Sequence, residues 1–568
     1  MGEGSADRGR AVRDRLLLYA VAGAVTAVVL APLAAPGYVL RYDMVFVPRQ
    51  PLTWDLVAPA QSLPRAVPMD AVVSLVTQLV PGWAVQRIVL AGTVLLAAVG
   101  AARLVPTQRR GVRLLGAVGY AWTPYLAERL LIGQWGLLVA YAALPWLVRA
   151  VLNLRAGRAG ALARVVLTAA PAAITPTGGL IAFGVVALLS PQRERWRRST
   201  VAVVGVAVLN SPWVTAALVT RAGGTSDPAG VAAFAARGEN WAGPLAALAG
   251  TGGIWSAQAT PASRALPLVP LVTLVLVVLA AAGVGLLRRR LPPGISARLV
   301  VLAGAGFLLA ALGAAPGTAE VLRWAVAHLP GAGLLRDGQK FLAPYALLLM
   351  VCAALGVERL VTRVERVSRE VAGVVLVGVL LLPVAVMPDL AFGGAGRLRP
   401  VSYPADWREV AGRLADDPGG EVLALPLSGY RAYPWNPGRI VLDPAPRYLP
   451  AAVLTDDTLR VGDVAVLGEN PRLREIRGLL EDGRPVAVTG VRWVVVQHHR
   501  ANRVDPATLA GFEVVYQGMF LTLYRNPSVP PRSVAVSPGQ WAVVAALGLA
   551  GVVVVAALVA LRRRPTAW

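Results

Sequence analysis

Long apolar runs recur along this chain, and short polar segments rich in arginine separate them. Most runs hold about 20 residues, the length an α-helix needs to cross the hydrocarbon core of a bilayer. The run over 160–190 is interrupted by Thr175-Pro176-Thr177-Gly178-Gly179, and proline with paired glycines ends a helix. The pattern predicts an all-α polytopic transmembrane bundle of about twelve spans, two of them short and meeting at this interruption. The predicted spans are 16–35, 83–104, 113–127, 135–152, the two halves of 160–190, 200–220, 266–287, 297–314, 341–357, 371–388 and 538–561.

The net charge of +24 comes from arginines that gather in the short segments between runs. In the twelve-span order all of these clusters fall on one side, and the positive-inside rule makes that side cytoplasmic. We therefore expect a multi-pass plasma-membrane protein with both termini in the cytoplasm and residues 1–15 as a cytoplasmic tail. No basic stripe interleaved with aromatic residues occurs, which argues against nucleic acid as a partner.

Two segments lie outside the membrane in this topology. The first is a loop over 36–82 within the membrane module of 16–388. The second is 389–536, where acids and prolines become frequent and apolar runs shorten to strand length. It predicts a small extracytoplasmic α/β domain, followed by a last span and basic tail over 537–568. Its expected strands are 421–427, 492–497 and a hairpin of 512–517 with 520–525, and its expected helices are 405–415 and 471–481.

The composition removes several function classes. Cys352 is the only cysteine and lies in an apolar run, so one chain has no disulfide framework and no thiolate metal site. The sequence has no phosphate-binding loop of the Walker or GxGxxG kind, no GxSxG and no HExxH. A nucleotide-driven pump and a serine hydrolase are therefore unsupported.

Asp43 is the first candidate for chemistry, because it follows the first span directly, at the external mouth of the predicted bundle. A carboxylate there is placed to deprotonate an acceptor hydroxyl, or to help hold a divalent cation such as Mg, Mn or Ca. The alternative is a solvated loop acid that pairs with Arg41 or Arg49.

Two further charged groups flank spans on the same side, where charge is costly unless it is used or solvated. Glu128 and Arg129 form an interfacial ion pair, or Glu128 is a second acid that serves a metal or the acceptor. The segment Arg336-Asp337-Gly338-Gln339-Lys340 contains the only lysine of the chain and precedes a span. Its two cations suit a phosphate group, assisted by the positive end of the helix, or they anchor the helix at the interface.

Four motifs carry a family resemblance: Pro81-Gly82-Trp83-Ala84-Val85-Gln86-Arg87, Gly116-Ala117-Val118-Gly119-Tyr120-Ala121-Trp122-Thr123-Pro124-Tyr125, Ala143-Leu144-Pro145-Trp146 and Arg336-Asp337-Gly338-Gln339-Lys340-Phe341. Over about residues 16–390 the chain resembles the amino-terminal membrane region of actinobacterial GT-C-type glycosyltransferases, in particular the mycobacterial α-(1→3)-arabinofuranosyltransferases. The resemblance implies a GT-C-like fold and a polyprenyl-phosphate-linked sugar as donor. It places the key acid in the first external loop, where Asp43 lies. The first loop lacks the adjacent acidic pair of many relatives.

The sequence thus favours an extracytoplasmic glycosyltransferase that moves a sugar from a polyprenyl-phosphate donor to a cell-envelope glycan or glycolipid acceptor. Asp43 and Glu128 are the expected catalytic acids. The donor phosphate is assigned to Arg336, Lys340 and Arg129, with supporting parts for Arg41, Asp337 and Gln339. The alternative is a non-catalytic membrane protein, either a transporter or flippase of lipid-linked sugars or a scaffold for envelope assembly. Most charges lie at span ends rather than deep in spans, which favours the enzyme.

Overall fold

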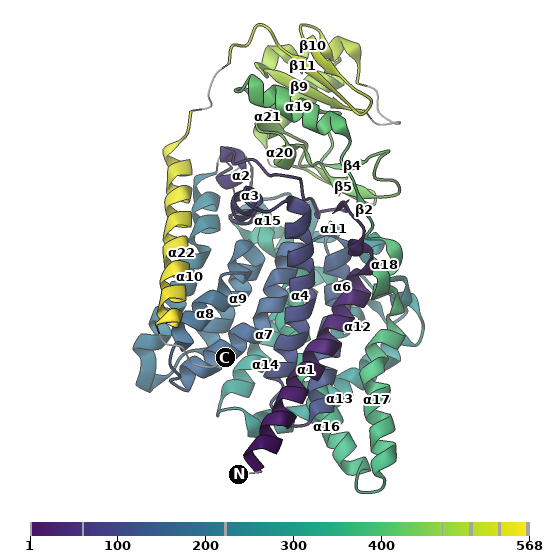
Figure 1. Ribbon diagram of the computed structural model, residues 1–568. Helices are drawn as coiled ribbons and strands as arrows, with labels where there is room; N and C mark the ends of the chain where they lie inside the picture. Colours follow the sequence, from purple (N-terminus) through teal and green to yellow (C-terminus); the bar gives the residue numbers. More distant parts are fainter. Residues whose placement is uncertain are drawn as a thin grey trace.

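The computed structural model describes residues 3–59, 62–220, 224–468, 470–498, 504–531 and 535–563. It consists of a bundle of roughly parallel and antiparallel helices with a small α/β domain at one end (Figure 1). We call this end of the bundle the domain end. The first helix begins at the opposite end (Figure 1).

Nine helices in the described part of the chain are long and apolar enough to cross a membrane, by length and composition. They belong to α1 (Glu3–Leu30), α4 (Gly82–Leu104), α7 (Trp135–Arg155), α10 (Trp196–Val219), α13 (Val269–Arg290), α14 (Ile295–Ala311), α16 (Ala343–Val364), α17 (Arg369–Val386) and α22 (Pro538–Arg562). The protein is therefore a multi-pass membrane protein, as predicted.

The count of nine differs from the expected twelve at two places, each with a local cause. The run over 160–190 forms α8 (Ala161–Ala169) and α9 (Pro176–Leu189), broken where expected, and Thr175 caps α9 by accepting a bond from Gly178 N at 3.3 Å. The predicted span 113–127 forms α5 (Arg110–Ala121) and α6 (Pro124–Leu131). Pro124 begins α6 and the Thr123 hydroxyl caps it at 3.2 Å, so neither half is long enough to be counted.

Close backbone contact joins two of the long helices. A methyl group at Gly283 of α13 would collide with the carbonyl of Cys352 in α16, and one at Gly356 with the carbonyl of Leu279. Small residues allow helices in a membrane to approach at this distance, where van der Waals contact replaces the hydrophobic effect. Cys352 itself is buried in this contact, as its apolar run predicted.

The arginine-rich helix ends lie away from the domain. Helices α4, α7, α13, α16 and α22 all end in a turn that contains arginine. Figure 1 shows α22 running from the domain linker towards the opposite end of the bundle. This separation of arginine from the domain is the distribution on which the predicted orientation depends.

The α/β domain contains one five-stranded mixed sheet of order β10-β11-β9-β3-β6. Strand β3 (Glu421–Leu425) is parallel to both β9 (Trp493–Gln497) and β6 (Ala452–Leu454). Strands β10 (Glu513–Gln517) and β11 (Leu521–Arg525) form the predicted hairpin. The predicted helices are α19 (Ala405–Asp416) and α21 (Pro471–Glu481). Local periodicity therefore gave these elements to within a few residues.

The remaining elements connect the domain and the bundle. Strand β1 (Tyr38–Val39) pairs with β2 (Pro400–Val401), and two hairpins, β4–β5 (Tyr430–Ala432, Ile440–Leu442) and β7–β8 (Leu459–Val461, Val464–Val466), extend from the domain. The shorter helices are α2 (Trp54–Val57), α3 (Met69–Thr77), α11 (Ala229–Ala233), α12 (Gly243–Ala249), α15 (Pro316–His328), α18 (Ala391–Gly396) and α20 (Ala445–Tyr448). The predicted external loop 36–82 thus holds β1, α2 and α3.

Candidate active site

Asp43 lies in a tight turn that the bundle and the domain hold together. Met44 N donates to Arg41 O at 2.9 Å and Arg41 N donates to Met44 O at 3.3 Å, which closes the turn. Tyr42 within it has φ +45°, a conformation that costs a non-glycine residue free energy. Strand β5 holds Tyr42 there: Tyr42 N donates to Ile440 O at 2.7 Å, and Leu442 N donates to Tyr42 O at 2.9 Å.

Gly133 makes room for this turn from the bundle side. Its φ of +83° favours glycine, and a methyl group there would lie 2.5 Å from Arg41 O and still closer to Met44 N. Asp43 N donates at 3.1 Å to the carbonyl oxygen of Ile132, the residue before Gly133. The turn that holds Asp43 therefore fits against the bundle because Gly133, which follows α6, adopts this left-handed conformation.

The Asp43 carboxylate, partly exposed, accepts one hydrogen bond from each side. Gln134 Nε2 of the bundle donates to Oδ2 at 3.3 Å, and the Tyr430 hydroxyl of β4 donates to Oδ1. Burial and the neighbouring carboxylate raise the pKa of Tyr430 well above its usual range, so its hydroxyl keeps the proton that it donates.

A cleft of about 1350 Å³ opens over Asp43 between the bundle and the domain. This volume exceeds the roughly 300–1,000 Å³ typical of small-molecule sites. Aromatic, charged and polar side chains from both parts line it, among them Tyr42, Trp255, Gln258, Tyr430, Arg460 and His498. The cleft can thus receive a bulky polar molecule beside a carboxylate that is already positioned.

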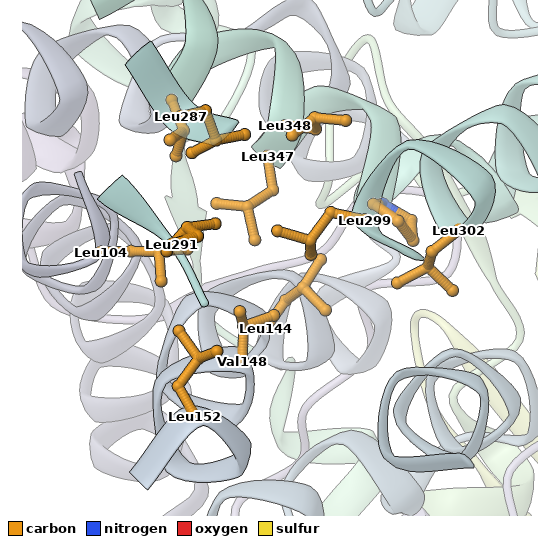
Figure 2. A pocket seen from close by; sticks show the side chains of 12 residues that line it. Leu104, Leu144, Val148, Leu152, Leu287, Leu291, Leu299, Leu302, Leu347 and Leu348 are labelled. Atoms are coloured by element: carbon orange, nitrogen blue, oxygen red, sulfur yellow. The ribbon is translucent and has the colours of Figure 1, made fainter. Parts of the chain in front are cut away.

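The cavity in Figure 2 is of a different kind. It measures about 20 Å³ within the bundle, and only leucine, valine and proline side chains line it, including Leu144, Leu299 and Leu347. A cavity of this size without polar side chains offers nothing that could hold or activate a substrate.

Arg41 and Arg49, the expected alternative partners of Asp43, bind elsewhere. Arg41 is buried, with its Nε donating to Leu131 O at 2.9 Å and its Nη2 to Gln258 O at 3.1 Å. Arg49 donates to the Gln78 side chain at 2.6 Å. Arg41 therefore supports the turn through the loops around it rather than through the carboxylate.

A continuous series of polar contacts leads from Asp43 to Lys340. Gln134 accepts from Arg129 Nη1 at 2.6 Å, and Arg129 lies 3.3 Å from Asp337 Oδ2. The Lys340 ammonium contacts the same Asp337 oxygen at 3.1 Å. We call Asp43, Gln134, Arg129, Asp337 and Lys340 the polar chain. It joins residues that the sequence placed in three separate groups.

The two cations decide the charge of Asp337. Burial alone would raise its pKa, but the Arg129 guanidinium and the Lys340 ammonium lower it to about 2. Arg129 is fully buried and matched by this carboxylate, whereas Lys340 is 29% exposed. Of the two, Lys340 is the cation that a ligand can reach.

Arg336 points to another neighbour. Its guanidinium lies over the ring of Phe234 at 5.3 Å from the centroid, a cation–π contact with the helix α11 region. The structure therefore brings Arg129, Asp337 and Lys340 together and directs the partly exposed Arg336 to a different side.

Glu128 and Gln339 lie in a second, fully buried cluster and not on the cleft. Glu128 Oε2 accepts from Ile254 N at 3.1 Å and from Gln339 Nε2 at 3.2 Å. Its other oxygen faces Glu239, which accepts from Arg264 Nε at 2.8 Å. We call these Glu128, Glu239 and Arg264 the carboxyl cluster.

One proton belongs between the two carboxyl groups of this cluster. Burial and the nearby Glu239 raise the pKa of Glu128 well above its usual range. For Glu239, burial is outweighed by the hydrogen bond from Glu128 and by Arg264, so its pKa is lowered. Glu128 is thus a neutral acid that donates to the Glu239 anion.

The described residues around Asp43 supply few ligands for a divalent cation. Ca²⁺ takes six to eight oxygen ligands, commonly from several carboxylates, whereas Mg²⁺ takes six and is often held by one or two carboxylates together with water and substrate phosphates. The described residues hold no group of three or more histidine, cysteine, aspartate or glutamate side chains in ligating positions. Asp43 contributes one carboxylate, whose two oxygens already accept from Gln134 and Tyr430. The described side chains around Asp43 therefore do not form a calcium site of this kind.

Sequence reasoning did not identify Gln134, Tyr430, Glu239 or Arg264 as site residues. Gln134 had a signal, since it is a polar residue between two apolar runs next to Arg129. Tyr430 had none, because 387 positions separate it from Asp43 and its environment is an ordinary strand. Pairs of this kind follow from the docking of the domain.

Comparison with known proteins gives a structural likeness. No protein-family description and no curated protein matches the chain. Among solved structures, the arabinofuranosyltransferase AftD from mycobacteria matches 91% of this chain and 40% of its own with a TM-score of 0.57 and 18% identity. A mutant of AftD matches 91% of this chain and 41% of its own with a TM-score of 0.52 and 20% identity. The chain thus spans about two fifths of the AftD length, and over most of its residues it has the fold of this membrane arabinofuranosyltransferase, the likeness that the sequence predicted.

Proposed function

We propose that the protein is a membrane glycosyltransferase that transfers a sugar from a polyprenyl-phosphate donor to a glycan or glycolipid acceptor. The fold shared with an arabinofuranosyltransferase supports the class of reaction. The observation that carries the proposal is the placement of Asp43, a positioned carboxylate in the lining of a large cleft that polar and apolar residues share. The arginine-rich helix ends opposite the domain support an extracytoplasmic cleft and cytoplasmic termini.

In this proposal Asp43 accepts the proton of an acceptor hydroxyl as its oxygen attacks the anomeric carbon of the donor sugar. The bond between that carbon and the phosphate oxygen breaks, and polyprenyl phosphate leaves with the bonding electrons. Developing charge on the phosphate needs a cation, and we assign that part to Lys340, the cation of the polar chain that a ligand can reach. Arg336 of the same segment lies over Phe234 and is a separate candidate for the donor phosphate. Their exposure is what a donor requires, since both are partly accessible.

The site is supported by buried contacts of Arg129, Asp337 and Gln339. Arg129 is fully buried and joins Asp337 to Gln134, so it fixes the geometry of the polar chain. Gln339 anchors the same segment to Glu128. We assign Glu128 a structural part, because its acid group lies in the carboxyl cluster and its proton is engaged by Glu239.

The first experiment measures binding of a panel of polyprenyl-phosphate sugars to purified protein in nanodiscs. We expect Lys340→Ala and Arg336→Ala to lose at least about tenfold in affinity, the effect of removing one charge-assisted contact to phosphate. Arg408→Ala, which removes an exposed arginine from α19, is the matched control and should bind like the wild type.

The second experiment measures transfer from the donor that binds. Asp43→Asn should abolish transfer while insertion and donor binding remain. Wild-type protein that binds no donor would move the assignment to a non-catalytic scaffold. Binding without transfer to any acceptor, together with transport of the lipid across the bilayer, would identify a flippase instead.

A further inference from the structure

The carboxylate of Asp43 is held across two parts of the chain. One oxygen accepts from Gln134 of the bundle and the other from Tyr430 of the domain. A carboxylate with a single donor can swing about its χ2 torsion, whereas two donors from opposite sides fix its plane. The domain therefore takes part in placing this side chain.

The same hairpin also fixes the backbone of the turn. Tyr430 and Leu442 are cross-strand partners in β4–β5. Tyr430 contacts the Asp43 carboxylate, and Leu442 N donates to Tyr42 O. One cross-strand pair thus contacts two consecutive residues of the turn.

A third contact extends this hold upstream, where Asn436 Nδ2, between the two strands, donates to Leu40 O at 3.0 Å. Asn436 is fully buried, so water does not compete for this bond. Leu40, Tyr42 and Asp43 are therefore all hydrogen-bonded to one segment of the domain, residues 430–442.

The hairpin is itself fastened to the central sheet. Arg431 Nε contacts Asp443 Oδ2 at 2.6 Å, and the Tyr433 hydroxyl donates to Gln497 Oε1 at 2.6 Å. Gln497 ends strand β9 and donates to Asp443 at 2.8 Å. All of these side chains are buried. These buried hydrogen bonds fasten the hairpin to the sheet, so the position of the sheet is passed to the turn.

The strain at Tyr42 shows why a clamp is needed. A non-glycine residue at φ +45° costs about 1–3 kcal/mol and persists only where the surroundings fix it. The backbone bonds to Ile440 and Leu442 supply that constraint. Without the hairpin the turn would relax, and Asp43 would leave the cleft position.

We propose that Tyr430 is a positioning residue and that the β4–β5 hairpin is a clamp, which makes the α/β domain a required part of the Asp43 site. This inference rests on the proposed function of Asp43. A general base misplaced by about 1 Å loses up to about 100-fold in rate, so the clamp acts on the chemical step.

The test is Tyr430→Phe in full-length protein, which removes the hydroxyl and keeps the ring. We expect kcat to fall by about 10- to 100-fold, with the donor KM within about twofold of wild type. Tyr516→Phe is the matched control, because Tyr516 also donates to an aspartate, Asp406, at 3.2 Å, but on the outer strand β10. It should leave kcat unchanged.

A second readout does not depend on transfer. The apparent free energies of unfolding of Asp43→Asn, Tyr430→Phe and the double variant form a cycle, and a coupling well outside error supports the contact. Asn436→Ala loosens the same turn by another bond and should lower kcat in the same direction. An inactive wild type with a coupled cycle would overturn the proposed function and leave the clamp standing. An active Tyr430→Phe at wild-type kcat, or additive energies, would overturn the clamp.

Discussion

Replacing Glu128 with glutamine changes a hydroxyl into an amide inside the carboxyl cluster and keeps the shape of the side chain. The new amide can donate to Glu239 as the acid proton does, and its oxygen can still accept from Ile254 N and Gln339 Nε2. If Glu128 is the neutral partner, no charge is lost. We therefore expect the free energy of unfolding to change by about 0.5 kcal/mol or less.

Glu128→Ala shows how much free energy of unfolding is lost when the side chain is removed altogether. It leaves the Ile254 amide without a partner and leaves Gln339 Nε2 with Gly252 O alone, at a site with no exposure, and each lost hydrogen bond to a buried group costs about 1–3 kcal/mol. The removed methylenes add a cavity. We expect Glu128→Ala to destabilise the protein by about 3–5 kcal/mol.

The measurement is unfolding in mixed micelles, with denaturing detergent titrated against a mild one and tryptophan fluorescence as the signal. Were Glu128 an anion matched to Arg129 and Arg264, glutamine would leave buried positive charge uncompensated, at a cost of about 3–5 kcal/mol. A Glu128→Gln variant as unstable as Glu128→Ala would therefore refute the shared proton. Loss of transfer in a stable Glu128→Gln variant would return Glu128 to the role of a second catalytic acid.

Three further outcomes follow from the described contacts. The folded protein holds the Glu128 proton more tightly than the unfolded chain, so its stability should fall as the pH rises above the ordinary glutamate pKa, and Glu128→Gln should flatten this dependence in unfolding scans. Gly133→Ala should lower transfer without lowering donor affinity, because its methyl group displaces the turn of Asp43, and equal transfer would contradict that packing. Asp337→Asn should cost about 3–5 kcal/mol by leaving buried Arg129 unmatched, whereas Lys340→Ala, at a partly exposed position, should cost about 1 kcal/mol or less in the same titration.

Individual residues show which features of the fold could be predicted from the sequence. Hydropathy gave the membrane spans and the break at Thr175, because the bilayer imposes one helix length on every span. At Trp122-Thr123-Pro124 the same rule did not foresee a capped helix start, which divides a run of adequate length into α5 and α6. Short apolar runs gave β3 and β9, which are buried on both faces at the centre of the sheet, and the β10–β11 hairpin beside them.

The candidate site could be predicted from the sequence only in part. Four of its residues are charged and lie beside apolar runs: Asp43, Arg129, Asp337 and Lys340. Because charge next to a membrane span costs free energy, such residues can be recognised from the sequence alone. Their connection through Gln134 cannot be recognised in this way, because the glutamine carries no charge and lies close in sequence to only one of them.

What the sequence determined by itself is the class of protein: a chain of apolar runs with arginine at alternate ends has to span a membrane, and its polar segment has to fold outside the bundle. The tertiary structure alone decided that the domain returns to Asp43, that Tyr430 meets its carboxylate, and that Glu128 meets Glu239 instead of the cleft. The physical reason is that these contacts join residues more than a hundred positions apart, and local periodicity carries no information about which surfaces dock.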